Sequence, residues 1–228
     1  KVFDLQNSSR TKFYKRFILR DIEWSSSESS LEPGQKKSDF DKNPVLDRME
    51  TQLIKSGINT EFVKNIDLSW AIQDETRLIK QYANNEYILL FPFCSPKLKN
   101  KKWPYFKNLI ERLKTEFKNK YPILLAPAPN EITEAKKLNT KIVLESNESI
   151  DIKKLISLIS KAKFIVSNDT GPAHIASHLD KKGLVLFGSH TSPTKVSIES
   201  FNFKALVSKD LEALNVDIVM NEIKKRLN

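Results

Sequence analysis

The clearest structural signal in this chain is the run Phe164-Ile-Val-Ser-Asn-Asp-Thr-Gly-Pro-Ala-His-Ile-Ala-Ser177. Its start, Phe164 to Val166, is a short apolar segment, typical of a buried strand in a parallel sheet. Turn-forming residues follow from Asn168 to Gly171. Pro172 is well suited to the first position of a helix. The run therefore predicts a strand, a sharp turn and a helix that begins near Pro172.

The turn before this helix is a candidate anion site. A helix N-terminus offers free N–H groups and the positive end of the helix dipole, and it would lie beside Asp169, Thr170 and Gly171. Gly171 has no side chain to hold a ligand away from the backbone. Because Asp and Thr are also ordinary helix caps, the turn by itself leaves capping and ligand binding as equal alternatives.

Beyond this run, strands and helices alternate. Apolar segments indicate strands, and helical spacing indicates helices. The predicted strands are 87–91, 123–126, 142–144, 184–187 and 205–207, and the predicted helices start at Pro104 or cover 150–162 and 216–227. This alternation predicts an α/β fold with a doubly wound parallel sheet. Such sheets bind ligands at the carboxyl ends of their strands.

The first 84 residues are less regular. Residues 1–5 indicate a strand, and Ser8 or Ser9 can cap a helix that carries several large apolar side chains on one side: Phe13, Tyr14, Phe17 and Ile18. The Ser-rich segment 25–41 is expected to be a mobile loop. Helices are predicted from Pro44 and from Asp74. We expect a domain boundary near residue 84, giving domains 1–84 and 85–228.

Composition narrows the class of protein. The 228 residues carry a formal net charge of +10, which favours nucleotides, nucleic acid or an anionic membrane face as partners. No basic stripe with stacking aromatic residues is evident, so we expect no specific nucleic-acid partner. A single cysteine, Cys94, excludes an internal disulfide and favours a cytoplasmic setting. The sequence contains no apolar run long enough to span a membrane.

Two further loops carry candidate ligand-binding residues. After the first predicted strand of the second domain, Ser95 offers a hydroxyl, and Lys101 beside Lys102 offers cations that suit a diphosphate. A solvated lysine run is the alternative. The loop after the next strand ends at Glu131, whose carboxylate could accept hydrogen bonds from ribose hydroxyls. It could equally be an acidic residue in a first helical turn.

The two histidines of the helix that is predicted to begin near Pro172 do not form a zinc motif. His174 and His178 are four residues apart and share a helix face. The zinc protease signature needs Glu directly after the first His, where this chain has Ile175, so we expect no metal. A buried or phosphate-contacting His174 is the preferred interpretation. After the next strand, Gly188 in the segment Phe187-Gly-Ser-His-Thr-Ser-Pro193 either borders the same cleft or forms an ordinary turn.

Taken together, these segments resemble glycosyltransferase family 9, the heptosyltransferases that transfer heptose from ADP-heptose in lipopolysaccharide core synthesis. The matching residues are Lys101-Lys-Trp-Pro104, Asp169-Thr-Gly-Pro-Ala-His174-Ile-Ala, and Leu186-Phe-Gly188 with Thr191 and Pro193. The resemblance covers residues 87–228 well, whereas Asp4-Leu-Gln6 and the helix ending at Gly57 match the family's N-terminal domain more weakly.

The resemblance implies a two-domain GT-B fold, in which residues 1–84 are the remnant of an acceptor-side domain and 85–228 bind the nucleotide-sugar. The C-terminal helix, 216–227, either packs within the domain 85–228 or packs back on the first domain. Lys101 and Ser95 would contact the donor phosphates, Thr170 and Gly171 the diphosphate, and Asp169 the sugar hydroxyls. Glu131 would be a ribose candidate, and His174 matches the motif without a clear role. The family works without a metal or other cofactor and inverts the anomeric centre.

Two departures from the family limit this inference. The family's catalytic base lies in a Gly-Asp segment that this chain, which begins at Lys1 inside a predicted strand, does not contain. We therefore assign no base, and we expect an N-terminally truncated fragment that is inactive. Phe93-Cys94 also stands where many members have a Gly-rich turn. The expected acceptor is a lipid-linked saccharide, with peripheral contact to the anionic inner membrane. A non-catalytic nucleotide-sugar-binding module is the alternative.

Overall fold

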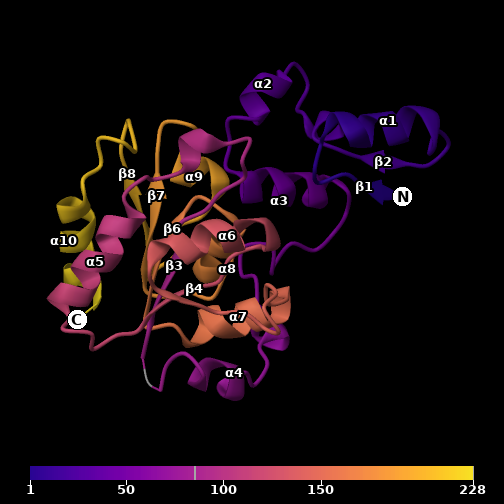
Figure 1. Cartoon of the computed structure of the whole chain (residues 1–228). Coiled ribbons are helices and arrows are strands. Elements are labelled where there is room, and N and C mark those ends of the chain that lie inside the picture. The colour runs from indigo at the N-terminus through magenta and orange to yellow at the C-terminus, as the bar shows by residue number, and fades with distance from the viewer. Residues whose placement is uncertain (85, 228) are drawn as a thin grey trace. The chain divides into compact units, whose positions relative to one another are not determined.

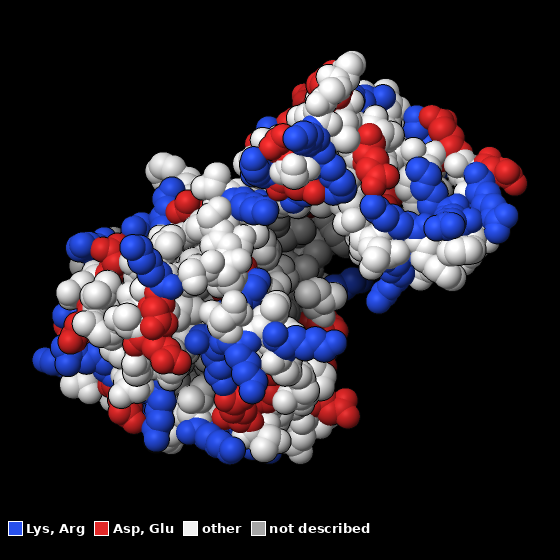
Figure 2. All heavy atoms as spheres, turned by 90° about the horizontal axis from the view of Figure 1, so that it is seen from above, with Lys and Arg blue, Asp and Glu red and all other residues white. Residues whose placement is uncertain are grey.

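The computed structural model describes residues 1–84 and 86–227, which form two compact units (Figure 1). Unit 1 comprises residues 1–66 with 194–197, and unit 2 comprises the described residues of 67–193 and 198–228. None of the helices in these described ranges is long and apolar enough to cross a membrane. Figure 2 shows Lys and Arg side chains interspersed with Asp and Glu on the visible face of each unit.

Unit 1 is built on a short parallel strand pair. Its elements are β1 (Val2–Phe3), α1 (Ser9–Phe17), β2 (Trp24–Ser25), the 3-10 turn η1 (Glu28–Ser30), α2 (Lys37–Phe40) and α3 (Val45–Lys55). The Ser8 side chain caps α1, as the sequence predicted. The buried Gln52 amide donates to the Asp4 and Ser25 carbonyl oxygens, each at 3.1 Å. This amide ties α3 to both strands, because it satisfies backbone acceptors at the end of each.

The expectation of a mobile loop over 25–41 was wrong. This segment forms η1 and α2, and it buries Phe40 together with several serines. The Ser30 hydroxyl donates to the Ser26 carbonyl oxygen at 2.8 Å, which replaces a solvent contact with an internal one. Local hydrogen bonds of this kind let a Ser-rich segment hold a fixed shape without an apolar core. The predicted apolar side of α1 is exposed, with the Phe13 and Phe17 side chains each 52% accessible.

Unit 2 is a doubly wound α/β unit, as predicted. It contains η2 (Ser69–Ala71), α4 (Thr76–Lys80), β3 (Ile88–Phe91), η3 (Lys99–Lys101), α5 (Phe106–Glu116), β4 (Ile123–Leu125), η4 (Pro129–Glu131), α6 (Ile132–Ala135), η5 (Lys136–Leu138), β5 (Lys141–Ile142), α7 (Ile152–Lys161), β6 (Phe164–Asn168), α8 (Gly171–His178), β7 (Gly183–Phe187), β8 (Phe203–Val207) and α10 (Val216–Leu227). The short helix α9 (Pro193–Val196) begins at Pro193 of unit 2, and its residues 194–196 belong to unit 1. Its six strands are all parallel, in the order β5-β4-β3-β6-β7-β8.

Helices cover both faces of this sheet (Figure 1). Alternate side chains of the strands, such as Leu90 and Val166, pack with α5 and α10 in one core. The helices α7 and α8 pack against each other, and α8 packs on β6. Gly183 lies where β7 approaches its neighbours most closely, since an added Cβ would be 2.6 Å from the Ile165 carbonyl oxygen. The four central strands β4, β3, β6 and β7 are buried because both faces are covered, whereas the edge strands β5 and β8 are partly exposed.

The division between the units lies earlier than the predicted boundary near residue 84. Residues 67–84 pack on other parts of unit 2: the Gln73 N–H donates to the hydroxyl of Ser157 in α7 at 2.8 Å, and the Tyr82 hydroxyl donates to the carbonyl oxygen of Leu144, just after β5, at 2.9 Å. Irregular sequence between two helices gave no sign of these contacts. At the other end, α10 packs on α5 and β7 of unit 2.

Candidate functional site

The candidate site lies where the strand order of unit 2 reverses. Within this unit, β3 is the first strand of the sheet in sequence and β6 is the fourth, yet they are neighbours with Phe91 paired to Ser167. The connections after β3 and β6 therefore leave in opposite directions, which opens a crevice at their carboxyl ends. The candidate residues Ser95 and Lys101 follow β3, and Asp169 to Gly171 follow β6. The topology thus brings together two loops that the sequence singled out separately.

Asn168, the last residue of β6, holds these loops together. Its side chain is completely buried. The amide oxygen accepts from the Trp103 N–H at 3.0 Å, and the amide nitrogen donates to the Pro92 carbonyl oxygen at 2.8 Å. One side chain therefore sets the position of both ends of the β3–α5 connection. Sequence reasoning treated Asn168 only as a turn former.

Lys101 and Asp169 form an ion pair at the centre of the site. The Lys101 ammonium lies 2.6 Å from Asp169 Oδ2, and the Asp169 side chain is only 3% exposed. A carboxylate at this depth needs a charged partner, since an unpaired buried charge is strongly unfavourable. The ammonium itself is partly exposed. The pair therefore places the Lys101 cation beside Asp169, which lies two residues before Gly171 in the chain.

The neighbouring residues of the lysine loop behave differently. Lys102 pairs with Glu134 and lies over the Phe93 ring, so only Lys101 of this pair reaches Asp169. Trp103 is a packed start to α5: its ring is buried and its indole N–H donates to the Leu214 carbonyl oxygen at 2.7 Å.

His190 was missed by sequence analysis. It lies in the loop after β7, and its Nε2 is 3.0 Å from Asp169 Oδ2. Its ring is 5% exposed and stacks on Phe187, with centroids 5.5 Å apart and an interplanar angle of 17°. The signal that could have found it was the strand order. Because β7 pairs with β6, residues just after β7 lie beside residues just after β6.

His174 is close to Asp169 but is not hydrogen-bonded to it. Its Nε2 lies 3.8 Å from Asp169 Oδ1. Burial lowers the pKa of His174, although Asp169 raises it and Lys101 lowers it further. Burial also lowers the pKa of His178, and His174 contributes to that shift. Both imidazoles are therefore favoured in the neutral form in the folded protein.

The N-terminus of α8 is not capped by a side chain. Thr170 is the N-cap residue, yet its side chain makes no capping hydrogen bond. Its hydroxyl instead lies 3.4 Å from both the Ser167 hydroxyl and the Asn168 carbonyl oxygen. Apart from its chain neighbours and the backbone of its own helix, no atom of the described residues lies within 4 Å of the position that a Cβ on Gly171 would occupy. Of the two alternatives left open by the sequence, simple side-chain capping does not describe this turn. The open helix end is available to an anion.

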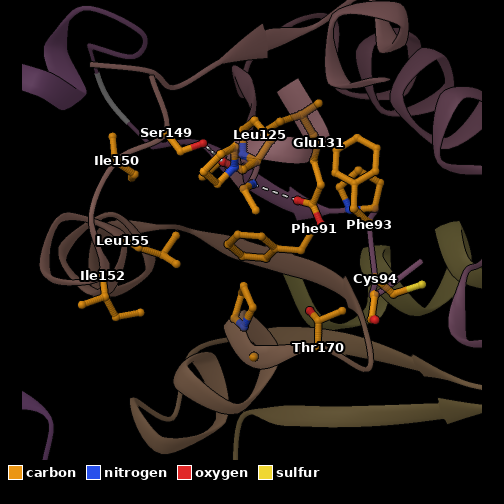
Figure 3. Close-up of a pocket in the computed structure, with 18 residues that line it drawn as sticks. Phe91, Phe93, Cys94, Leu125, Glu131, Ser149, Ile150, Ile152, Leu155 and Thr170 are labelled. Carbon is orange, nitrogen blue, oxygen red and sulfur yellow. Dashed lines mark hydrogen bonds between the residues drawn. The ribbon is translucent and has the colours of Figure 1, made fainter. Parts of the chain in front are cut away.

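A cavity of about 370 Å³ adjoins this helix end (Figure 3). Ligand pockets typically enclose about 300–1,000 Å³, so the cavity suits a small organic molecule. Its walls come from four loops of unit 2 and include Ser95, Glu131, Ser149, Thr170 and Gly171. Most of the remaining lining is apolar and includes Phe91, Leu125, Ile152 and Leu155, whose side chains surround the opening in Figure 3.

Glu131 is one of the cavity's polar groups. Its Oε2 accepts from the Ala128 N–H at 2.8 Å, drawn as a dashed line in Figure 3. Burial raises the pKa of the Glu131 carboxyl, while the Ala128 N–H lowers it. The carboxylate therefore closes its own turn and also faces the cavity. Its contact with ribose hydroxyls stays a prediction.

Lys101, Asp169 and His174 do not line the cavity. Asp169, which Lys101 and His174 approach, directly precedes the lining residue Thr170 in the chain. The site thus joins an apolar cavity, an open helix N-terminus and a cation. Among residues 1–84 and 86–227 no group of three or more His, Cys, Asp or Glu side chains could hold a metal ion.

Comparison with known proteins supports one family. The profile of glycosyltransferase family 9 (heptosyltransferase) matches residues 26–215. A search of curated proteins found no significant match.

Several solved structures share the fold. E. coli heptosyltransferase WaaC with ADP has a TM-score of 0.68 at 19% identity, covering 99% of this chain and 72% of that one. E. coli ADP-heptose lps heptosyltransferase II has a TM-score of 0.62 at 16% identity, covering 82% of this chain and 62% of that one. Methanocaldococcus jannaschii UDP-GlcNAc 2-epimerase, in complex with UDP-GlcNAc and UDP, has a TM-score of 0.52 at 14% identity. The match covers 80% of this chain and 52% of the epimerase. This chain thus spans about half to three quarters of the length of these proteins. The two heptosyltransferases share the GT-B fold with it.

Proposed function

This chain belongs to glycosyltransferase family 9, and we propose that it acts in the transfer of heptose, or a related sugar, from ADP-heptose to a lipopolysaccharide core acceptor. The observation that carries the proposal is the ion pair between Lys101 and Asp169 beside the uncapped N-terminus of α8. A nucleoside diphosphate-sugar needs a pocket for the nucleoside, donors for the diphosphate and polar groups for the sugar. These three features adjoin one another in unit 2.

The nucleoside would occupy the cavity. Its lining is mostly apolar, as expected for a pocket that encloses a planar base. Glu131 faces the cavity and could accept hydrogen bonds from ribose hydroxyls. From there the diphosphate would reach the backbone at Thr170 and Gly171. Gly171 has no side chain, which leaves room for the diphosphate. Ser95, on the opposite loop, would donate its hydroxyl to the same phosphates.

The chemical step would be an in-line displacement at the anomeric carbon. An acceptor hydroxyl oxygen forms the new glycosidic bond, the bond from the anomeric carbon to the diphosphate oxygen breaks with its electron pair, and ADP leaves with inversion. A general base must take the acceptor proton, and we assign that base to no residue of this chain. Asp169 would hold hydroxyls of the transferred sugar.

Stabilisation of the leaving ADP is the step to which this chain contributes most directly. Negative charge grows on the diphosphate as the bond breaks, and prearranged cations and N–H groups lower the barrier. Lys101 and the N-terminus of α8 are such groups. They could neutralise the leaving group without a metal ion, so we propose a metal-independent reaction.

The roles of the two units follow from this assignment. Unit 2 would bind the donor, and unit 1 would belong to the acceptor side. The acceptor would be a lipid-linked saccharide, and the reaction would take place at the cytoplasmic face of the anionic inner membrane.

Calorimetry with ADP-heptose, a UDP-sugar and a GDP-sugar tests the donor class. We expect ADP-heptose to bind at least about tenfold more tightly than the others, since discrimination by a few hydrogen bonds amounts to 1.4 kcal/mol or more. Preferential binding of the UDP-sugar would contradict the assignment. A complete protein containing this site that binds ADP-heptose but leaves it intact with every acceptor tried would favour the alternative, a non-catalytic nucleotide-sugar-binding module.

A further inference from the structure

His190 makes a polar contact that the proposed reaction does not use directly. Its Nε2 is 3.0 Å from Asp169 Oδ2, the same oxygen that receives the Lys101 ammonium at 2.6 Å. A carboxylate can only accept hydrogen bonds. The hydrogen must therefore sit on His190 Nε2, which donates to Asp169.

The other ring nitrogen faces away from the ligand site. Nδ1 is buried and has no hydrogen-bond partner in the part of the chain that the structure describes. It lies 3.5 Å from the point that a Cβ on Gly188 would occupy, so it faces its own loop. The ring does not line the cavity. Any effect of His190 on a ligand must then pass through Asp169.

Two donors from separate elements meet at one carboxylate oxygen. Lys101 comes from η3, and His190 comes from the loop after β7. Together they fix the Oδ2 end of the Asp169 carboxylate. Oδ1 is 3.8 Å from His174 Nε2, beyond hydrogen-bond distance. Oδ1 therefore keeps the capacity to accept a further hydrogen bond.

The His190 donor matters most when the Lys101 ammonium also binds a diphosphate. If a diphosphate draws the Lys101 ammonium toward itself, Asp169 would keep a buried charge with a weakened partner. Such a charge is unfavourable unless another donor remains. The stacked ring of His190 is held in place by Phe187 and supplies that donor without moving.

We propose that His190 is a positioning residue: its Nε2–H holds the Asp169 carboxylate oriented, so that Oδ1 accepts a hydroxyl of the donor sugar. This inference rests on the proposed function, because it assumes that Asp169 contacts the sugar. It assigns His190 no contact with substrate.

Two substitutions of His190 distinguish the role of its hydrogen-bond donor from that of its stacked ring. His190→Phe keeps a ring that can stack on Phe187 and removes the Nε2–H. His190→Gln loses the ring and keeps an amide N–H at a similar reach. Calorimetry should be run with ADP-heptose and with ADP, because their affinity ratio isolates the contribution of the sugar. A purely structural role for His190 would weaken both ligands together and would be rescued by Phe.

We expect His190→Phe to lower the affinity for ADP-heptose relative to that for ADP by about tenfold or more, because Asp169 loses the charge-assisted hydrogen bond that orients Oδ1 toward the sugar. His190→Gln should recover most of the loss. An unchanged affinity ratio in His190→Phe would overturn the inference and leave the proposed function standing. A wild-type chain that binds neither ligand would overturn both.

Nitrogen NMR of the wild-type imidazole provides a test that does not depend on variants folding. With no ligand bound, His190 should show a hydrogen on Nε2 and none on Nδ1. A ring with hydrogen on Nδ1 and none on Nε2 would overturn the inference.

Discussion

The ammonium of Lys101 lies 2.6 Å from the carboxylate of Asp169, although the two residues are 68 positions apart in the chain. The pair exists because β3 and β6 are neighbours in the sheet and the loop of each strand opens at the same edge. An anion at the N-terminus of α8 would meet this ammonium directly. The predictions below test whether that arrangement is a binding site.

Removing the Lys101 ammonium should abolish most of the transfer activity. In an active protein that contains this site, we expect Lys101→Met to reduce kcat/KM by about a hundredfold, as is typical when one charge-stabilising donor is lost. The matched control is Lys99→Met, in the same 3-10 turn with an exposed side chain, and it should stay close to wild type. Equal losses in both variants would indicate a general effect of loop charge.

Substitutions at two glycines distinguish an effect on ADP affinity from an effect on the folding free energy. Gly171→Ala places a methyl group in open space at the helix end, so the folding free energy should stay close to wild type while ADP affinity falls. Gly183→Ala places a methyl group 2.6 Å from the Ile165 carbonyl oxygen and 2.7 Å from the Phe203 ring. We expect it to destabilise the fold by about 1–3 kcal/mol.

Urea unfolding and ADP calorimetry on both glycine variants measure these effects. An unchanged affinity for ADP in Gly171→Ala would show that no ligand approaches the backbone there.

Asn168 should be essential for the shape of the site. Asn168→Ala leaves the buried Trp103 N–H and the Pro92 carbonyl oxygen without their partners. Each unsatisfied buried group costs about 1–3 kcal/mol, so we expect a loss of several kcal/mol in urea unfolding. Asn168→Asp keeps the acceptor for Trp103 but has no amide donor for Pro92, and it adds a buried charge. A stability close to wild type in Asn168→Ala would contradict the clamp that we describe.

Stability should fall as the pH falls below neutrality. Burial lowers the pKa of both His174 and His178 from the ordinary value of 6.5. The unfolded chain then binds more protons than the folded one in this range, so the free energy of unfolding decreases as the pH falls from about 6.5 through the lowered pKa values. Urea unfolding at several pH values measures the slope.

The double variant His174→Gln with His178→Gln removes both groups and is the control for this slope. Its pH dependence between about 6.5 and 5 should be shallower than that of the wild type. Parallel curves would show that other groups cause the loss.

Local sequence was sufficient to predict the strands of the unit 2 sheet, its longer helices and the loops that carry its chemistry. Phe164 to Val166 is apolar and Pro172 sets a helix start, and such choices depend on neighbours within a few residues. Lys101, Asp169 and Gly171 were recognisable because each follows a strand, and in a parallel sheet the carboxyl ends of the strands form one edge.

Tertiary structure alone decided which groups meet. The contact of His190 with Asp169 spans 21 residues and depends on β7 lying beside β6. The choice of Lys101 over Lys102, the fixed shape of residues 25–41 and the docking of residues 67–84 on unit 2 depend likewise on packing partners. A local pattern specifies the type of an element, whereas strand order and register determine which distant side chains share a buried space.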